Sequence, residues 1–366
     1  MFIYQKRNWP EFYWEIEKIS KILVSVRHKQ GRLVGRMEGM GFHLQSEATL
    51  NTITLDVLKS SEIEGEMLDK EQIRSSIARK LGLDVGGLVP ADRNVEGIVE
   101  MMLDATQNYS ERLADERLFD WHAALFPTGR SGMNKIIVAA WRTHGKDDPM
   151  RVVSGPMGRE KVHFQAPDTE KIEHEMKIFI KWFNEANELD PVLKAAITHL
   201  WFVTIHPFDD GNGRIARALT DMQLARADRS IQRFYSMSTQ IRKERKEYYT
   251  ILEKTQKGDL DITKWLIWFL ECLERAIDNS EENLSTVLSK WRFWEKHSST
   301  TLNERQRKMI NRLFSGFEGK LTSSKWAKMN KCSQDTAGRD INDLIDKRIL
   351  QKEPGGGRST SYAINV

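Results

Sequence analysis

The stretch that most constrains the fold is residues 206–217, which read His-Pro-Phe-Asp-Asp-Gly-Asn-Gly-Arg-Ile-Ala-Arg. Before it, the Asp-Pro pair at 190–191 has the residue types of a helix N-cap and a first helical position. Apolar residues follow at helical spacing, and Pro207 disfavours helical backbone at His206. The sequence therefore predicts a helix that ends at His206, a loop, and a second helix that begins near Ile215.

The loop between these two helices has the composition of an anion site. Gly211 and Gly213 permit positive φ angles, so successive backbone N–H groups can converge at the start of the second helix. Arg214 and Arg217 lie one helical turn apart and can both donate to phosphate oxygens. An ordinary interhelical loop with surface arginines would explain any one of these residues. Because they occur together within twelve positions, we favour the anion site.

Two further residues add chemistry to this loop. Asp210 offers the hard oxygen ligands that Mg²⁺ prefers when it bridges phosphates. His206 can accept a proton near neutral pH, as a general base must. The motif lacks the Gly-Lys-Ser/Thr of a Walker A loop, which excludes that kind of nucleotide site.

With its histidine, Phe, acid, Gly-Asn-Gly-Arg and second arginine, the stretch resembles the signature of the Fic family of AMP-transferring proteins. The resemblance implies that His206 takes the proton of a target hydroxyl, which then attacks the α-phosphate of ATP. It implies that Asp210 holds Mg²⁺ and that Asp209 faces solvent. The implied ATP site in this stretch consists of Asp210, Gly211, Asn212, Gly213, Arg214, Ile215, Ala216 and Arg217.

A second motif lies upstream, at residues 60–65. Taken alone, Glu64 is an unremarkable glutamate on a helix. Self-restrained Fic proteins, however, carry Ser or Thr, three residues, Glu, and then Gly or Asn, a pattern that Ser60, Glu64 and Gly65 match. By this resemblance Glu64 pairs with Arg217, withdraws it from the γ-phosphate, and so inhibits the enzyme.

Between residues 131 and 167 the helical pattern lapses, and extended segments replace it. Fic proteins have a β-hairpin flap here, which binds the target protein by strand addition. The flap edge implied to reach the nucleotide comprises Lys161, Val162, His163 and Phe164. Further on, Gln256 stands where the family has an asparagine that contacts the nucleotide.

Composition sets the broad class. The 366 residues carry 56 basic and 52 acidic side chains, a net charge of +4 that favours no partner class by itself. The two cysteines have no metal-ligand spacing, and we find neither a signal core nor an apolar run long enough for a membrane span. We therefore expect a cytoplasmic protein without membrane contact, and we read His122 as a packed structural histidine.

We predict a mainly α protein with three domains. These are a helical N-terminal domain over residues 1–90 that contains the inhibitory motif, a Fic catalytic domain over residues 91–295 with a small β-hairpin flap, and a C-terminal module over residues 300–366.

The C-terminal module resembles a winged helix-turn-helix. Helical patterns at 303–314, 323–329 and 333–347 precede two short strands, 349–352 and 361–364, joined by a Pro-Gly-Gly-Gly turn. Residues 301–366 contain 13 Lys or Arg and 7 Asp or Glu, a net charge of +6 that favours nucleic acid. Four aspartates on the last helix would repel phosphates. DNA and a protein therefore both remain open as partners of this module, and a homodimer remains open for the whole chain.

These observations favour a protein adenylyltransferase that uses ATP and Mg²⁺, modifies a hydroxyl of a target protein and of itself, and is restrained by Glu64. Two alternatives remain open. One is another transfer on the same site, either of a different nucleotide or removal of AMP. The other is a winged-helix DNA-binding regulator whose core only senses a nucleotide.

Overall fold

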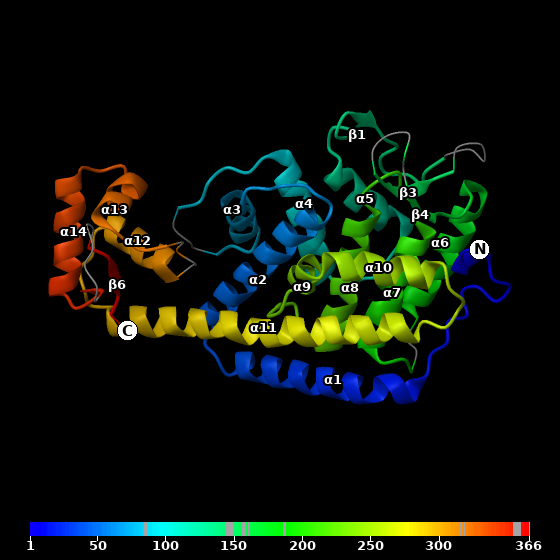
Figure 1. Cartoon of the computed structure of the whole chain (residues 1–366), viewed down its shortest axis with the longest axis horizontal. Coiled ribbons are helices and arrows are strands. Elements are labelled where there is room, and N and C mark those ends of the chain that lie inside the picture. Colours follow the sequence, from blue (N-terminus) through cyan, green and yellow to red (C-terminus); the bar gives the residue numbers. More distant parts are fainter. Residues whose placement is uncertain are drawn as a thin grey trace. The chain divides into compact units, whose positions relative to one another are not determined.

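Helices form most of the computed structural model, as predicted, and the strands occur only as short hairpins (Figure 1). The structure describes all residues except 84–86, 144–148, 156–158, 160, 186–187, 315–316, 318, 354–359 and 366. The chain divides into two compact units, residues 1–281 and residues 282–366. The predicted boundary near residue 90 lies inside the first unit, and the predicted boundary at 295–300 lies just beyond the division.

The first unit begins with a short 3₁₀ helix, Ile3–Gln5, and continues with ten α-helices and two hairpins among the described residues. The helices are α1 (Ile16–Glu38), α2 (Phe42–Ile63), α3 (Lys70–Lys80), α4 (Arg93–Gln107), α5 (Asp115–Leu125), α6 (Thr169–Asn184), α7 (Pro191–Ile205), α8 (Asn212–Asp228), α9 (Met237–Lys243) and α10 (Arg245–Gln256). The hairpins pair β1 (Arg130–Ser131) with β2 (Asn134–Lys135) and β3 (Arg151–Ser154) with β4 (Lys161–Gln165). Helix α11 (Thr263–Lys296) starts in the first unit and continues into the second.

Helix α7 lies at the centre of the first unit. Every residue from Val192 to Ile205 is buried, because the helix is apolar on nearly all sides and α8 packs along it. Asp190 caps its start through a hydrogen bond from the Val192 N–H, as predicted. The α7–α8 pair therefore supports the loop of residues 206–211 on a rigid base.

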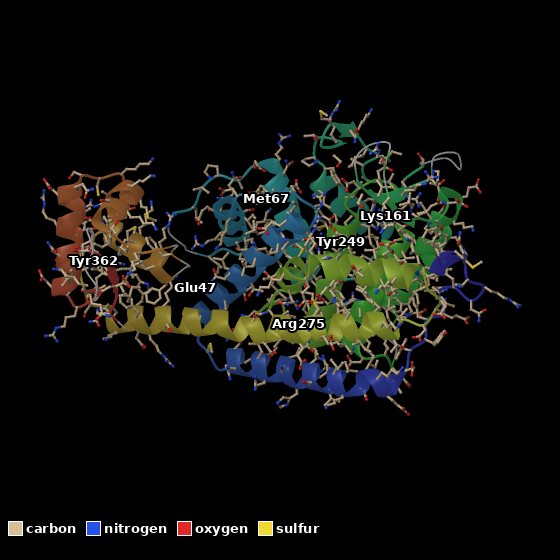
Figure 2. All side chains as sticks on the ribbon, in the orientation of Figure 1. Glu47, Met67, Lys161, Tyr249, Arg275 and Tyr362 are labelled. Carbon is tan, nitrogen blue, oxygen red and sulfur yellow. The ribbon has the colours of Figure 1, made fainter. Side chains whose placement is uncertain are left out.

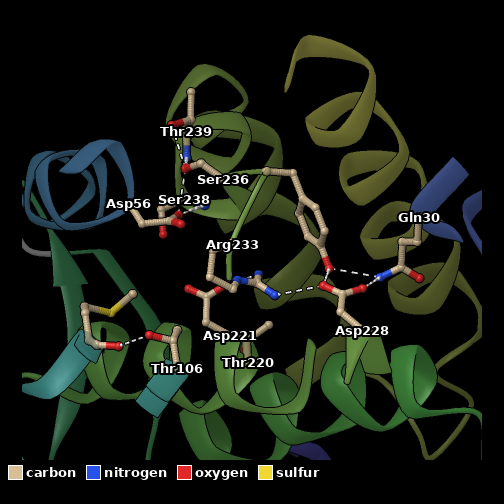
Figure 3. Close-up of polar contacts among 12 residues, drawn as sticks. Gln30, Asp56, Thr106, Thr220, Asp221, Asp228, Arg233, Ser236, Ser238 and Thr239 are labelled. Atoms are coloured by element: carbon tan, nitrogen blue, oxygen red, sulfur yellow. Dashed lines mark hydrogen bonds and ion pairs between the residues drawn. The ribbon is translucent and has the colours of Figure 1, made fainter. Parts of the chain in front are cut away.

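A buried polar network ties α8 to α1 (Figure 3). Arg233, which is 1% exposed, donates to Asp221 at 3.0 Å and to Asp228 at 3.1 Å. Asp228 also accepts hydrogen bonds from the Tyr235 hydroxyl at 2.7 Å and from Gln30 of α1 at 3.1 Å. Because each buried carboxylate contacts the buried guanidinium, the charges compensate one another inside the core.

Asp56 joins α2 to the same region (Figure 3). Asp56 is 2% exposed, and its carboxyl group accepts hydrogen bonds from the Ser236 hydroxyl at 2.6 Å and the Ser238 N–H at 3.3 Å. Burial and the nearby Asp221 raise the pKa of Asp56 to about 8. Asp56 lies one turn before Ser60, so the helix that carries the predicted inhibitory motif is anchored here.

The second unit has its own core around Trp326, which is fully buried. It contains α12 (Glu304–Phe314), α13 (Ser323–Asn330), α14 (Gln334–Asp346) and the hairpin of β5 (Leu350–Lys352) with β6 (Tyr362–Ile364). The three predicted helices and two predicted strands are confirmed to within two residues. The predicted Pro-Gly-Gly-Gly turn, residues 354–357, lies outside the described residues.

Two further features concern the whole described chain. None of its described helices has both the length and the apolar character required to cross a membrane. Cys272 and Cys332 are both free thiols, and Cys272 is buried.

Candidate functional site

His206 forms the corner between α7 and the loop. It is the C-cap of α7, with a φ of 53°, and its Nδ1 lies 3.3 Å from the Val203 carbonyl oxygen. If Nδ1–H donates to this carbonyl, the lone pair of Nε2 is left to accept a proton. Burial lowers the pKa of His206 to about 4, so the imidazole is neutral near pH 7. A neutral, oriented imidazole is the state that a general base requires.

Arg142 holds this corner in place, although no sequence motif singled it out. Its Nε donates to the His206 carbonyl at 2.7 Å, and its backbone N–H donates to the Pro207 carbonyl at 2.9 Å. Its Nη2 reaches the Pro167 carbonyl at 2.6 Å, and the residue is 3% exposed. These contacts join residues distant in sequence, so no local pattern could have revealed them.

Asn212 clamps the loop from within. Its Oδ1 accepts the Phe208 N–H at 3.0 Å, and its Nδ2 donates to the Phe208 carbonyl at 2.8 Å. Gly211 precedes it with a φ of 81°, and a Cβ there would lie 2.9 Å from the Phe126 ring. Glycine is therefore required at 211 both for the backbone angle and for space.

His122 supports the loop from α5, which confirms its predicted structural role. Its ring stacks on Phe208 with centroids 4.2 Å apart, and its Nε2 lies 3.2 Å from the Asp210 carbonyl oxygen. Its Nδ1 accepts the Ala139 N–H at 3.2 Å. Burial lowers its pKa to about 4, which keeps the ring neutral.

The two aspartates of the loop differ in their contacts. The Asp210 carboxylate accepts hydrogen bonds from the Ser131 hydroxyl and the Gly211 N–H. The Asp209 carboxylate accepts the Ile137 N–H at 2.8 Å and is only partly exposed. The expectation that Asp209 faces solvent is therefore wrong, since its carboxylate fastens the segment after β2 to the loop.

The structure brings Ser60 and Glu64 of the upstream motif to Arg217. Arg217 is 2% exposed and donates to the Ser60 hydroxyl at 2.8 Å, the Ser60 carbonyl at 3.0 Å and Glu64 Oε1 at 2.8 Å. A Cβ on Gly213 would lie 2.3 Å from the same Glu64 oxygen. The third residue of the motif, Gly65, follows with a φ of 87°. Glu64 thus lies against the start of α8, where an anion would bind.

Both arginines of the loop motif retain a spare donor. Arg214 Nε and Arg217 Nη1 are buried and have no hydrogen-bond partner among the described residues. No side chain caps the α8 N-terminus within that part of the chain, so its first N–H groups are also available. Unsatisfied buried donors are costly, and phosphate oxygens would satisfy them. The residues present therefore fit the phosphates of a nucleotide.

The four predicted flap residues lie on β4 and differ in exposure. Lys161 (Figure 2) and Val162 on β4 are exposed, whereas Phe164 is 2% exposed and packs on aromatic rings of the N-terminal segment. Both ring nitrogens of His163 make hydrogen bonds: Nε2 lies 2.6 Å from the Ser154 hydroxyl, and Nδ1 lies 2.6 Å from the Glu253 carboxylate of α10. The His163–Glu253 contact fastens the flap to α10.

Three other predicted residues have buried side chains. Ile215 and Ala216 are fully buried in the core, so only their backbone could serve a ligand. Gln256 is 5% exposed, and its amide lies 3.4 Å from the Val203 carbonyl oxygen and 3.3 Å from the Thr204 hydroxyl. The contacts of Gln256 therefore hold the last turn of α7, directly before His206.

Asp210 is the predicted metal ligand of the site. No group of three or more His, Cys, Asp or Glu could hold a metal among the described residues. Mg²⁺ commonly binds through one or two carboxylates together with substrate phosphates and waters. Asp210, with no lysine or arginine bonded to its carboxylate in the contacts above, fits that pattern.

Two sequence families match this chain. Residues 112–224 match the Fic/DOC family, and residues 2–83 match a domain of unknown function, DUF4172. The loop of residues 206–217 lies in the first match. Ser60, Glu64 and Gly65 lie in the second, so the contact with Arg217 joins the two matched regions.

Curated relatives that match this chain are also Fic proteins by name. The protein adenylyltransferase Fic of Drosophila mojavensis is 26% identical over 227 residues, which cover 61% of this chain and 40% of that protein. The protein of the same name from Nematostella vectensis is 36% identical over 116 residues, 31% of this chain and 25% of that protein. The chain thus spans less than half the length of these relatives.

Solved structures share the fold. A Fic family protein from Desulfovibrio desulfuricans gives a TM-score of 0.55 at 21% identity, covering 96% of this chain and 97% of that one. A Fic domain containing signaling protein from Bacteroides thetaiotaomicron gives 0.51 at 18% identity, covering 74% and 95%. At these identities the likeness concerns the fold alone.

Proposed function

Since residues 112–224 match the Fic/DOC family, we propose that the chain is a protein adenylyltransferase, which moves AMP from ATP to a hydroxyl side chain of a target protein. The observation that carries the proposal is the conjunction of a neutral, oriented His206 with two arginines that hold unused buried donors. The two relatives described above are both named protein adenylyltransferase Fic.

In this reaction His206 Nε2 takes the proton of the target hydroxyl. The hydroxyl oxygen then forms a bond to the α-phosphorus of ATP, the bond from that phosphorus to the bridging oxygen breaks, and pyrophosphate leaves. The N–H groups at the start of α8 and the guanidinium of Arg214 stabilise the phosphate charge. Such a transfer depends on positioning and electrostatics more than on covalent help from the protein.

Mg²⁺ is part of the proposal, with Asp210 as its protein ligand. When bound, the ion would neutralise charge on two phosphates of the substrate. The hydrogen bond from the Ser131 hydroxyl holds the Asp210 carboxylate at β1.

The proposal also assigns the target protein to the flap and the restraint to Glu64. Val153 and Val162 are 47% and 41% exposed on β3 and β4, which supports an apolar contact with an extended segment. Glu64 occupies one donor of Arg217, which supports a restrained ground state.

Mass spectrometry of proteins incubated with ATP and the Glu64→Gly variant tests this function. We expect a mass increase equal to AMP on a Ser, Thr or Tyr of the target or of the enzyme itself. In His206→Ala the rate should fall by about 10²–10⁴. A different added group would favour transfer of another nucleotide, and loss of AMP from a modified protein would favour the reverse chemistry. An unchanged rate in His206→Ala would contradict the mechanism.

A second candidate function concerns the second unit, for which we propose DNA binding. Asp340 is 5% exposed and bonded by Arg305 at 2.8 and 3.0 Å, and Asp343 is bonded by Lys347 at 2.6 Å. Two of the four aspartates that argued against phosphate binding are therefore already paired. Arg339 is exposed on the same helix, α14.

Anisotropy of a labelled duplex tests this candidate, with the full chain as the protein. Affinity should fall steeply with salt and should drop in Arg339→Ala, while Arg307→Ala removes the same charge from α12 as a control. Asp335 and Asp346 remain exposed on α14 and oppose binding. Absent or salt-independent binding would favour a protein partner for this unit.

A further inference from the structure

A second carboxylate contacts the other arginine of the loop. Glu66 Oε2 lies 2.7 Å from Arg214 Nη1, and the two residues are 148 positions apart in the sequence. The Arg214 side chain is 7% exposed and that of Glu66 is 39% exposed. The guanidinium also lies over the Phe126 ring, 4.9 Å from its centroid. One end of α2 therefore supplies carboxylates to both Arg214 and Arg217.

The way α2 ends explains how one segment reaches both arginines. The Gly65 N–H donates to the Glu62 carbonyl at 3.2 Å, and the Glu66 N–H donates to the Ser61 carbonyl at 3.0 Å. This pair of bonds, with Gly65 at a φ of 87°, is a Schellman motif. The left-handed glycine reverses the chain, so Glu64 and Glu66 flank the turn and both face α8.

Anchoring of α2 does not require Glu66. The Arg245 Nε donates to the Ile63 carbonyl at 2.7 Å, Arg217 donates to Ser60, and Asp56 is buried one turn before Ser60. The Glu66 side chain is 39% exposed, so solvent screens part of its attraction for Arg214. Its position is more informative, because Glu66 bonds Nη1 of the same guanidinium whose Nε is the unused donor, so its negative charge would oppose a phosphate bound there.

We propose that Glu66 is a positioning residue that acts through Arg214: it bonds the guanidinium in the nucleotide-free state, and its charge opposes the binding of the phosphates of ATP to the same guanidinium. This inference rests on the proposed function for the identity of the nucleotide. It adds a second restraint to that of Glu64, so that each arginine of the loop is held by its own carboxylate.

The test is the affinity for ATP, measured by calorimetry on the full chain in a His206→Ala background, where turnover is suppressed. Glu66→Gln should lower the Kd for ATP about 3- to 10-fold. This range lies between the interaction free energy typical of an exposed ion pair and the coupling free energy typical of allostery. Glu64→Gly should lower the Kd separately, and the double variant should bind more tightly than either. Glu62→Gln is the matched control, because Glu62 contacts Lys59 and Arg242 instead of the loop arginines.

Thermal unfolding separates this role from a structural one. Glu66→Gln should keep the Tm of the parent, and Glu66→Ala serves as a second variant that removes the carboxylate without adding an amide. An unchanged or weaker affinity in both variants would overturn the inference, as would a lack of ATP binding in every variant. If the Kd changes as expected while the same Glu66 and Glu64 variants with His206 intact modify no protein hydroxyl, the proposed transfer fails and the role of Glu66 stands.

Discussion

The Arg217 side chain donates hydrogen bonds to both the side chain and the backbone of Ser60. Nε donates to the Ser60 hydroxyl at 2.8 Å, and Nη2 donates to the Ser60 carbonyl at 3.0 Å. Nη2 is shared with Glu64 Oε1 at 2.8 Å. The last turn of α2 therefore holds Arg217 through two residues, of which only Glu64 carries a charge. Loss of Glu64 removes the competing charge but leaves the hydrogen bonds to Ser60.

The first prediction follows from this contact. Glu64→Gly should raise the rate of AMP transfer about 5- to 150-fold, the range of ordinary intramolecular coupling energies. Arg217→Ala in the same chain should abolish the gain, because the two residues contact each other and their effects are not additive. Initial rates with saturating ATP and target measure this. A Glu64→Gly enzyme no faster than wild type would contradict the restraint.

The two loop aspartates should behave differently when they are changed to asparagine. Asp210→Asn should weaken Mg²⁺-dependent ATP binding, because an amide is a poorer ligand than a carboxylate, while the fold is retained. Asp209→Asn should instead loosen the segment around Ile137, whose N–H the carboxylate accepts. Calorimetry with and without Mg²⁺ gives the first effect, and hydrogen exchange at residues 135–139 gives the second. The reverse pattern would show that the metal ligand is Asp209.

The pH dependence of the rate should reflect the burial of His206. A general base acts in its neutral form, so the rate is lost as the pH falls through the pKa. Since burial lowers that pKa to about 4, the initial rate should remain near its plateau from pH 8 to about pH 5. An unperturbed histidine would give half the rate at about pH 6.5. Circular dichroism at each pH controls for unfolding.

Asp56 should make the first unit less stable as the pH rises. Its folded-state pKa is raised to about 8, so between about pH 4 and pH 8 the folded state holds a proton that the unfolded state has lost. Stability from this group is complete below that window and declines by up to about 1.4 kcal/mol per pH unit across it. Asp56→Asn keeps an acceptor for Ser236 and should flatten this decline.

Denaturant unfolding at pH 5 and pH 8 measures the effect of Asp56. Asp120→Asn, at an exposed position on α5, is the control and should leave the decline unchanged. An Asp56→Asn variant with the pH dependence of wild type would contradict the raised pKa.

The sequence predicted those parts of the site that local signals specify. The N-cap at Asp190, the proline after His206 and the loop glycines act on their own neighbours, so the helix–loop–helix could be read directly. The pairing of Glu64 with Arg217 joins residues 153 positions apart and followed only from the family resemblance. Neither local sequence signals nor the family resemblance predicted the contacts of Arg142 and Glu66, because these contacts depend on how distant segments pack.

The same distinction explains the wrong expectation for Asp209. An acidic residue in a glycine-rich loop is expected to be exposed to solvent when only the sequence is considered. Its actual partner, the Ile137 N–H, lies 72 residues away in an irregular segment. Likewise, Phe164 matches the flap edge in sequence, but contacts with the N-terminal aromatic rings turn its side chain into the core.

His206 has a positive φ of 53°, a backbone conformation that glycine and asparagine adopt more readily than histidine. The chain therefore keeps an imidazole where a smaller residue would relieve conformational energy of roughly 1 kcal/mol or more. Selection of variants for heat resistance alone should drift toward Gly or Asn at this position and lose activity in the process. Thermostability and chemistry are opposed at this residue, so a library screened for one must be counter-screened for the other.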